Sequence, residues 1–299
     1  MIKMIEIIFN GLAVGAIYSL IALGFVLLYK SIGIINFAQG ELAMFGAFIC
    51  YGFAVLLKVP YVFAFLITLV LGALLGAIID SLFFRRMVGE PIFSNIMMTV
   101  GLASILTSVA GVIWGHDVYA LPSPFTNVTK TVGGVVFSLG YLYTLIVSIL
   151  FFVAFLIFFN RSLLGIAMRG TAEDQNTAGL MGINVKRVYM MAWAIGTMVA
   201  AVAGIFLAEQ SFVRLAMSQT GIKAMSAAIL GGLNSIGGAI LGGLIVGIVE
   251  NLSATYLSGI EIAHFHFGDI KDVTAFVVMI IVLMIRPHGI FGKEKVERV

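Results

Sequence analysis

Three polar side chains interrupt an apolar stretch near the start of the chain, within the sequence INFAQGE at residues 35–41. Asn36 and Gln39 can donate and accept hydrogen bonds, and Glu41 can carry a negative charge. An ionisable side chain inside an apolar segment is by default a candidate functional site, because burying it away from water costs free energy. These three side chains are therefore candidates to line the route of a polar solute.

A structural explanation of the same cluster also follows from the residues. Asn36 is a good capping residue for a helix that begins after it, and Gly40 permits a break in the backbone. The apolar segment 32–57 is longer than one untilted membrane span requires. We therefore expect a helix break at membrane depth, where irregular backbone must be surrounded by protein or face a watery cavity. Architecture beside a solute route is favoured over direct contact with the solute.

A second polar cluster lies in the glycine-rich stretch 221–252. Asn234 and Ser235 stand between two glycine pairs, which are Gly231 with Gly232 and Gly237 with Gly238. Glycines around a polar centre are typical of the discontinuous helices of transporters. The pattern predicts a broken or re-entrant helix, and a hairpin between two short spans is the alternative. These six residues are further candidates for the helix break or the translocation path.

The third stretch is the unusually polar connection at residues 160–187. Thr171 followed by Asp174 resembles a capping box, and it predicts a short helix that ends near Gly182. Ala172, Ala178, Leu180 and Met181 give this helix small and apolar contact positions. An amphipathic turn on the surface and a docking helix for a soluble partner both fit these residues.

Other chemistry finds little support in the sequence. No GxxxxGK[ST] phosphate loop is present, so we do not expect this chain to bind or hydrolyse ATP. His264, His266 and Asp269 make a weak metal candidate, and the single cysteine, Cys50, excludes a disulfide within the chain. No arrangement of a nucleophile with a base stands out. We predict neither an enzyme nor a bound metal or cofactor.

Composition then defines the surroundings of these clusters. Hydrophobic residues make up 61% of the 299 positions, charged residues 10%, and the mean hydropathy is +1.14. Soluble domains are about 45–50% apolar and about a quarter charged. Such a chain cannot cover a water-facing surface, so it must be an integral membrane protein. The scattered basic residues suit membrane orientation and not nucleic-acid binding.

The apolar segments that must position these clusters number about eight. The sequence predicts an all-α, polytopic membrane bundle that forms a single domain over residues 1–299. One segment is too long and too glycine-rich for a plain helix. The segments lie at residues 7–29, 32–57, 61–80, 93–114, 139–159, 188–208, 222–257 and 272–286.

Basic residues between the segments predict the orientation. Arg85 and Arg86, the connection 160–187, and the end of the chain from Arg286 are rich in Lys and Arg. By the positive-inside rule these three stretches are expected in the cytoplasm, with the connection 115–138 and the N-terminus outside. The segment 222–257 must then begin and end on the outer side, which a broken helix achieves more easily than one straight span.

Four separated motifs resemble the LivH-type permeases of branched-chain amino acid ABC importers, in the same order and from end to end. They are NGLAVGAIYSLIALGFVLLYKSIGIINFAQGELAMFGAF (10–48), AEDQNTAGLMGIN (172–184), KAMSAAILGGLNSIGGAILGGLIVGIVE (223–250) and RPHGIFGK (286–293).

The resemblance implies partners that the sequence alone does not reveal. It implies a second, homologous permease subunit, two cytoplasmic ATP-binding subunits and a substrate-binding protein outside, in the inner membrane of a bacterium. It also implies that the second motif is the coupling loop, and that ATP is bound by the partners. The coupling positions carried over from the family are Ala172, Glu173, Ala178, Gly182 and Ile183.

The expected function is ATP-driven alternating access for branched-chain or other apolar amino acids. Permeases for urea and short amides resemble the chain in the same motifs and give the first alternative. An ion-coupled secondary transporter is a second alternative, with Glu41, Glu209 and Glu250 as its only obvious acidic candidates. A non-transporting membrane scaffold is a third, and it would have no need for a broken helix at 231–238.

Overall fold

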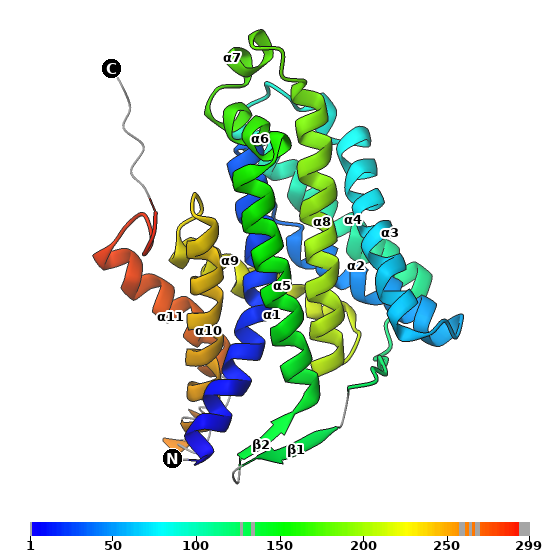
Figure 1. The fold of residues 1–299 in the computed structure, drawn as a ribbon, viewed down its shortest axis with the longest axis vertical. Helices are drawn as coiled ribbons and strands as arrows, with labels where there is room; N and C mark the ends of the chain where they lie inside the picture. Colours follow the sequence, from blue (N-terminus) through cyan, green and yellow to red (C-terminus); the bar gives the residue numbers. More distant parts are fainter. Residues whose placement is uncertain are drawn as a thin grey trace.

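The computed structural model describes residues 2–125, 128–132, 135–256, 261–262, 265–266 and 270–292. Within these residues the fold is a helical bundle, with one short β-hairpin beside it and another near its C-terminal part (Figure 1). Its helices are α1 (Ile2–Ile32), α2 (Gln39–Tyr51), α3 (Tyr61–Leu82), α4 (Ile92–Trp114), α5 (Leu139–Arg161), α6 (Leu163–Glu173), α7 (Gln175–Leu180), α8 (Val185–Gln210), α9 (Thr220–Gly231), α10 (Ile236–Tyr256) and α11 (Ile270–Ile285).

Several shorter elements join these helices. A π-helical turn, η1 (Gly52–Leu56), continues α2, and two 3-10 turns are η2 (Phe84–Arg86) and η3 (Leu215–Gln219). Strands β1 (Thr129–Val132) and β2 (Val135–Ser138) pair antiparallel with Thr129 opposite Ser138. Strands β3 (Glu261–Ile262) and β4 (Phe265–His266) form the second small hairpin. The prediction of an almost wholly helical bundle is confirmed.

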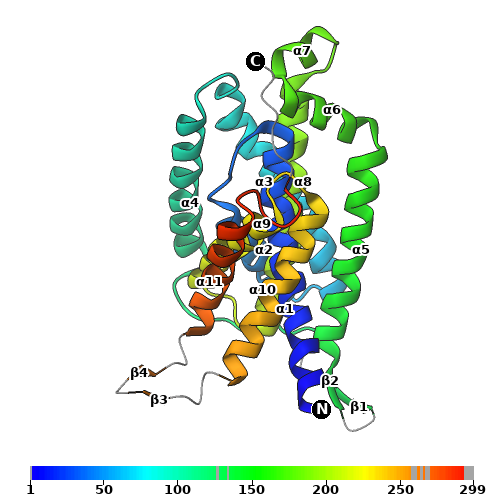
Figure 2. The same cartoon turned by 90° about the vertical axis from the view of Figure 1, so that its left-hand side faces the viewer.

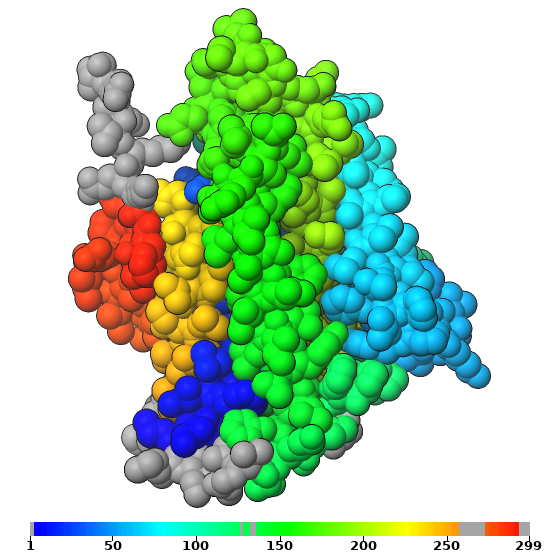
Figure 3. Space-filling view, in the orientation of Figure 1, coloured from blue at the N-terminus to red at the C-terminus, as the bar shows by residue number. Residues whose placement is uncertain are grey.

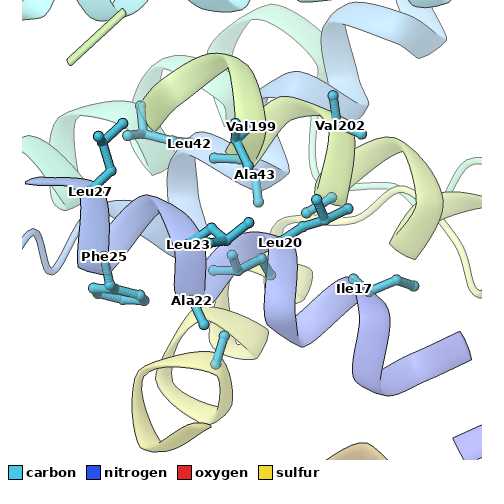
Figure 4. Packing of buried hydrophobic residues seen from close by; sticks show 14 of the residues in the cluster. Ile17, Leu20, Ala22, Leu23, Phe25, Leu27, Leu42, Ala43, Val199 and Val202 are labelled. Atoms are coloured by element: carbon cyan, nitrogen blue, oxygen red, sulfur yellow. The ribbon is translucent and has the colours of Figure 1, made fainter. Parts of the chain in front are cut away.

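Helix α1 lies at the centre of the bundle because apolar side chains cover its whole circumference. Ile17, Leu20 and Leu23 are fully buried. Figure 4 shows Leu20 and Leu23 on the side of α1 that faces Ala43 of α2 and Val199 of α8. Helices α3, α4 and α5 instead leave much of their apolar surface exposed, as lipid-facing helices do.

Glycine pairs bring the central helices into backbone contact. A Cβ atom on Gly15 would lie 2.8 Å from the Cα atom of Leu244, and one on Gly247 would lie 2.3 Å from the Cα atom of Gly15. The small-xxx-small spacing of Gly11 and Gly15 on α1 therefore packs against that of Gly243 and Gly247 on α10, as expected for membrane helices.

Gly111 and Gly115 have the same spacing in a different setting. Gly111 faces the side chains of His116 and of Leu215 in η3. Gly115 follows the last residue of α4 with a φ of 83°, a conformation that favours glycine. This glycine ends a helix, so its spacing from Gly111 has no role in helix packing.

The two ends of the bundle carry different elements. Helices α6 and α7 lie at one end, and the start of α1 lies with β1 and β2 at the other (Figures 1 and 2). Among the residues that the structure describes, seven helices are long and apolar enough to cross a membrane. The eighth predicted segment, 272–286, corresponds to α11 (Ile270–Ile285), whose 16 residues make it shorter than those seven helices.

Candidate functional site

The first predicted break is present between α1 and α2, and α2 lies at mid-height in the bundle (Figures 1 and 2). The Asn36 side chain accepts a hydrogen bond from the Ala38 N–H at 3.0 Å and donates to Gln39 Oε1 at 3.0 Å. Gln39 Nε2 donates to the Gly196 carbonyl oxygen at 3.3 Å. Asn36 and Gln39 are fully buried. The side chains of Asn36 and Gln39 therefore have hydrogen-bond partners within the protein, and the bond from Gln39 connects the break to α8.

Two details of this break differ from the sequence-based interpretation. Asn36 does not cap α2, because its side chain bonds two residues ahead and forms a turn before the helix. The glycine with a positive φ is Gly33, at 72°, whereas Gly40 lies in the first turn of α2. Sequence reasoning missed Gly33 because nothing distinguished it from a packing glycine.

Gly40 instead allows α2 and α9 to touch. A Cβ atom there would lie 2.1 Å from the Ser218 carbonyl oxygen and 2.9 Å from the Cα atom of Gly221. Two helices that begin inside the bundle thus meet at their first turns. Glu41, half-buried in the same turn, lies beside the Ser218 side chain. Helix N-termini favour nearby negative charge, so this position suits a carboxylate.

The second break is present between α9 and α10. Gly232, with a φ of 101°, ends α9, and the Gly238 N–H donates to Ser235 Oγ at 3.1 Å at the start of α10. A Cβ atom on Gly231 would lie 2.0 Å from the Gly238 carbonyl oxygen. These glycines let the chain turn back on itself. The prediction of a broken helix is confirmed, and the 12 residues of α9 are too few for it to be one of two spans. Of the other residues predicted here, Asn234 lies in the turn, and Gly237 lies exposed in the first turn of α10.

Residues of the fourth sequence motif bond to the end of α9, although they lie far from it along the chain. The Ile290 N–H donates to the Leu230 carbonyl oxygen at 2.9 Å, and the Phe291 N–H donates to that of Gly231 at 3.2 Å. The last carbonyls of α9 would otherwise lack partners inside the protein. The turn at residues 286–292 therefore caps α9. Sequence reasoning did not find this contact, because nothing local links segments so far apart along the chain.

A buried ion pair joins three helices. Lys223 Nζ of α9 lies 2.7 Å from Glu250 Oε1 of α10, and the Tyr18 hydroxyl of α1 donates to Glu250 Oε2 at 2.6 Å. The signal in the sequence was one lysine and one glutamate in the same apolar segment, and we had not paired them. The pair fixes the short helix α9 against the two helices beside it.

The acidic candidates for an ion site are therefore engaged with protein groups. Glu250 is paired as above, Glu209 accepts a hydrogen bond from the Tyr61 hydroxyl, and Glu41 lies beside Ser218. Within the described residues no group of three or more His, Cys, Asp or Glu side chains is placed to hold a metal ion. His264 and Asp269 lie outside the described residues, and the side chain of His266 is also not described.

The connection 160–187 folds into two short helices. Ser162 caps α6, accepting a hydrogen bond from the Gly165 N–H at 2.9 Å. Asp174 caps α7, accepting bonds from the N–H groups of Asn176 and Thr177 at 2.8 and 3.0 Å. The prediction that Thr171 caps this helix is wrong. Thr171 lies inside α6, where its hydroxyl donates to the Ala167 carbonyl oxygen at 2.9 Å. Asp174 is the better cap because its carboxylate reaches two N–H groups.

The predicted coupling residues lie around α7, and their surroundings differ. Gly182 has a φ of 86° and lies just after Met181, the residue that follows α7, so the helix ends near Gly182 as predicted. Ala178 is buried and its carbonyl oxygen accepts from the Ile183 N–H at 3.0 Å. Glu173 and Gly182 are exposed, and Ala172 and Ile183 are half-buried.

The tip of α7 projects from the bundle and is apolar. Leu180 is 89% exposed and Met181 80% exposed. Figure 3 shows this segment extending beyond the ends of the long helices. Gln175 Nε2 at the start of α7 donates to the Tyr189 hydroxyl of α8 at 2.7 Å. An exposed apolar tip on a helix that is tied to a long buried helix is suited to docking and to transmitting movement.

Comparison with known proteins matches the chain at residues 7–283 to the family described as the permease component of branched-chain amino acid transport systems. The chain belongs to this permease family. It is similar to the Escherichia coli K12 high-affinity branched-chain amino acid transport system permease protein LivH, with 33% identity over 97% of this chain and 96% of the relative. The Pseudomonas aeruginosa permease protein BraD is 34% identical, with the same coverage of both chains.

A solved structure supports the fold of the permease. PsaBC from Streptococcus pneumoniae in complex with Fab has a TM-score of 0.51, and the match covers 96% of this chain and 92% of that chain. The sequence identity is 15%, so this likeness concerns the fold alone. The resemblance inferred from the four motifs is confirmed at the level of the family.

Proposed function

We propose that this permease moves branched-chain or other apolar amino acids across the bacterial inner membrane by ATP-driven alternating access. The observation that carries the proposal is α7, whose exposed Leu180 and Met181 lie beyond the bundle while Gln175 is bonded to α8. This arrangement, in a chain similar to LivH and BraD over nearly its whole length, supports a subunit driven by others.

The proposed assembly contains two permease subunits, two cytoplasmic ATP-binding subunits and an extracytoplasmic binding protein. The absence of a phosphate loop from the sequence supports a separate source of ATP hydrolysis. In the proposed cycle, ATP draws the two ATP-binding subunits together, and α7 carries that movement to α8. The helices around the break at α2 and α9 then shift between outward-open and inward-open arrangements.

An ion-coupled transporter is less well supported. Such a protein needs an ion site, and Glu250 and Glu209 already have partners in Lys223, Tyr18 and Tyr61. Asn36 and Gln39 are also bonded to protein, which favours their role as architecture beside the route. Of the polar residues at the first break, Glu41 therefore remains the candidate to contact the solute along the route.

Reconstitution tests the proposal directly. The permease is placed in liposomes with the second permease, ATP-binding subunits and binding protein encoded by neighbouring genes, and uptake of labelled leucine, isoleucine, valine, urea and acetamide is measured. We expect ATP-dependent uptake of the amino acids only. Preferential uptake of urea or acetamide would instead identify an amide permease. Accumulation by this chain alone, driven by an ion gradient, would refute the proposal.

A further inference from the structure

An apolar groove of about 320 Å³ lies between α5 and α8. Phe151, Ala154 and Phe158 line it on α5, Met198 lines it on α8, and its other lining side chains are also hydrophobic. Figure 3 looks onto this side of the molecule, where α8 is visible between α5 and α3. A polar ligand would lose its hydrogen bonds to water in such a groove, so hydrocarbon fits it better.

The groove has the depth of one leaflet of a bilayer. Phe151 lies ten residues before Arg161, the last residue of α5, which is about 15 Å along a helix. The hydrocarbon core of a bilayer is roughly 30 Å thick, so one leaflet contributes about 15 Å. With Arg161 at the edge of the core, the groove lies within the leaflet on the side of α6 and α7.

Arg161 lies at the end of this groove. It follows Ala154 by seven residues and Phe158 by three, so the three side chains share one face of α5. The Arg161 side chain is exposed. Within the part of the chain that the structure describes, neither Arg161 nor Arg169 forms an ion pair with a carboxylate. Arg161 is therefore placed to bind a negative group at the membrane surface.

Two further cations lie close to the wall of the groove. Arg169 of α6 and Lys30 of α1 both lie over the ring of Phe159, at 5.5 and 5.3 Å from its centre. That ring stacks on Phe155, which lines the groove, with 6.2 Å between the ring centres. Three positive charges thus gather around the last turns of α5. Like charges repel one another, so an anion bound beside Arg161 would be stabilised by all three.

The rest of this end of the bundle is balanced in charge. The described residues there include four more basic side chains, Arg85, Arg86, Lys186 and Arg187, and four acidic ones, Asp80, Glu90, Glu173 and Asp174. Asp80 is fully buried, and the carboxylate of Asp174 is occupied with the cap of α7. The three cations around α5 therefore leave a net positive charge, which favours an anionic lipid over a neutral one.

We propose that this groove binds an acyl chain of an anionic phospholipid whose phosphate contacts Arg161. An acyl chain gains little by moving from the bilayer into the groove, because both are apolar, so the charge supplies the selectivity. The inference goes beyond the proposed function and does not depend on it. The bound chain would lie against α8, the helix that Gln175 joins to α7.

Retention of lipids by the purified full-length permease tests the site. The protein is exchanged into detergent with phosphatidylglycerol or phosphatidylethanolamine of the same acyl chains, and the bound lipid is measured by native mass spectrometry. Arg161→Gln removes the charge, and Ala154→Phe fills the groove from an exposed position. The matched controls are Lys3→Gln, an exposed cation at the opposite end of the bundle, and Val153→Phe, since Val153 is 50% exposed and lies outside the groove.

We expect Arg161→Gln to retain phosphatidylglycerol about tenfold more weakly, the usual effect of losing a hydrogen bond between charged groups, and phosphatidylethanolamine as before. Ala154→Phe should retain both lipids more weakly, because its ring occupies the place of the chain. Both controls should behave like the wild type.

Three results would overturn the inference. Retention of phosphatidylglycerol within twofold of the wild type in both Arg161→Gln and Ala154→Phe would show that the groove does not select the lipid. An equal loss in Lys3→Gln would mean that net charge alone attracts it. Unchanged lipid retention by Ala154→Phe, together with loss of the second permease from the assembled transporter, would assign the groove to a contact between subunits.

Discussion

At the scale of single residues, the ion pair between Lys223 and Glu250 shows how a charge is held inside an apolar bundle. The exposed fractions of the two side chains are 19% and 11%. Removal of one partner from a buried pair leaves the other charge uncompensated, which costs more than replacing both.

Lys223→Met is therefore expected to lower the free energy of unfolding by roughly 3 kcal/mol. The double variant Lys223→Met with Glu250→Gln should recover most of that loss, because no unpaired charge is left. Unfolding of the purified permease in detergent, followed by circular dichroism, measures both. A single variant as stable as the double variant would contradict a pair that matters through its charge.

Asp174 is a residue outside the membrane whose protonation affects local structure. Hydrogen bonds from the backbone and hydroxyl of Thr177, and from the backbone of Asn176, lower the pKa of Asp174 below its ordinary value of 3.8. A lowered pKa in the folded state means that the cap stabilises α7 at neutral pH and is lost as pH falls below the ordinary value.

A spin label on Leu180→Cys can follow this loss, because Leu180 is exposed and the natural Cys50 is buried. We expect constant mobility of the label from pH 7 to about pH 5, and higher mobility as pH falls below about 3.8. Asp174→Ala should show the higher mobility at every pH. A pH-dependent rise that persists in Asp174→Ala would mean that another group is responsible.

At the scale of elements, the backbone turn at Gly182 sets the angle between α7 and the helix that follows it, α8. Gly182 has a φ of 86°, and a Cβ atom there would meet no other atom within 4 Å. A side chain at this position is therefore strained by its backbone conformation and not by crowding.

Gly182→Val is expected to reduce substrate uptake per ATP hydrolysed while the protein still inserts into the membrane. Gly179→Val is the matched control, since it adds the same side chain in open space inside α7, without a positive φ. Uptake and ATPase rates in proteoliposomes give the ratio. Equal losses in both variants would attribute the effect to bulk on the docking surface instead of backbone strain.

The elements also show which parts of the fold can be predicted from sequence. Apolar runs predicted the long helices, and the glycine-rich sequence around residues 231–238 predicted a helix break, because both depend on patterns within one segment. Contacts between distant segments were missed, including Lys223 with Glu250 and Ile290 with Leu230. Thr171 and Gly40 were assigned the wrong local roles, because several residues nearby satisfied the same rule equally well.

At the scale of the whole molecule, the positive-inside rule predicts that α7 and the connection after α4 lie on opposite sides of the membrane. The two segments lie at opposite ends of the bundle, in agreement with that topology (Figure 2). The direction in which the bundle is inserted stays a prediction.

Labelling of single cysteines tests this direction. Asp117→Cys and Leu180→Cys place thiols at exposed positions near the two ends, and the natural Cys50 is buried and should react little. A membrane-impermeant maleimide should label Asp117→Cys in intact spheroplasts and Leu180→Cys only in inverted vesicles. Labelling of both from the same side would refute the predicted topology.

The bonds from Ile290 and Phe291 to the end of α9 have a consequence for biosynthesis. A ribosome makes Gly231 almost sixty residues before it makes these two partners, so the nascent helix waits in the translocon with its final carbonyls unmet. The end of α9 is thus capped late in synthesis. A stop codon just before residue 286 would release a chain in which the last carbonyls of α9 lack these two partners.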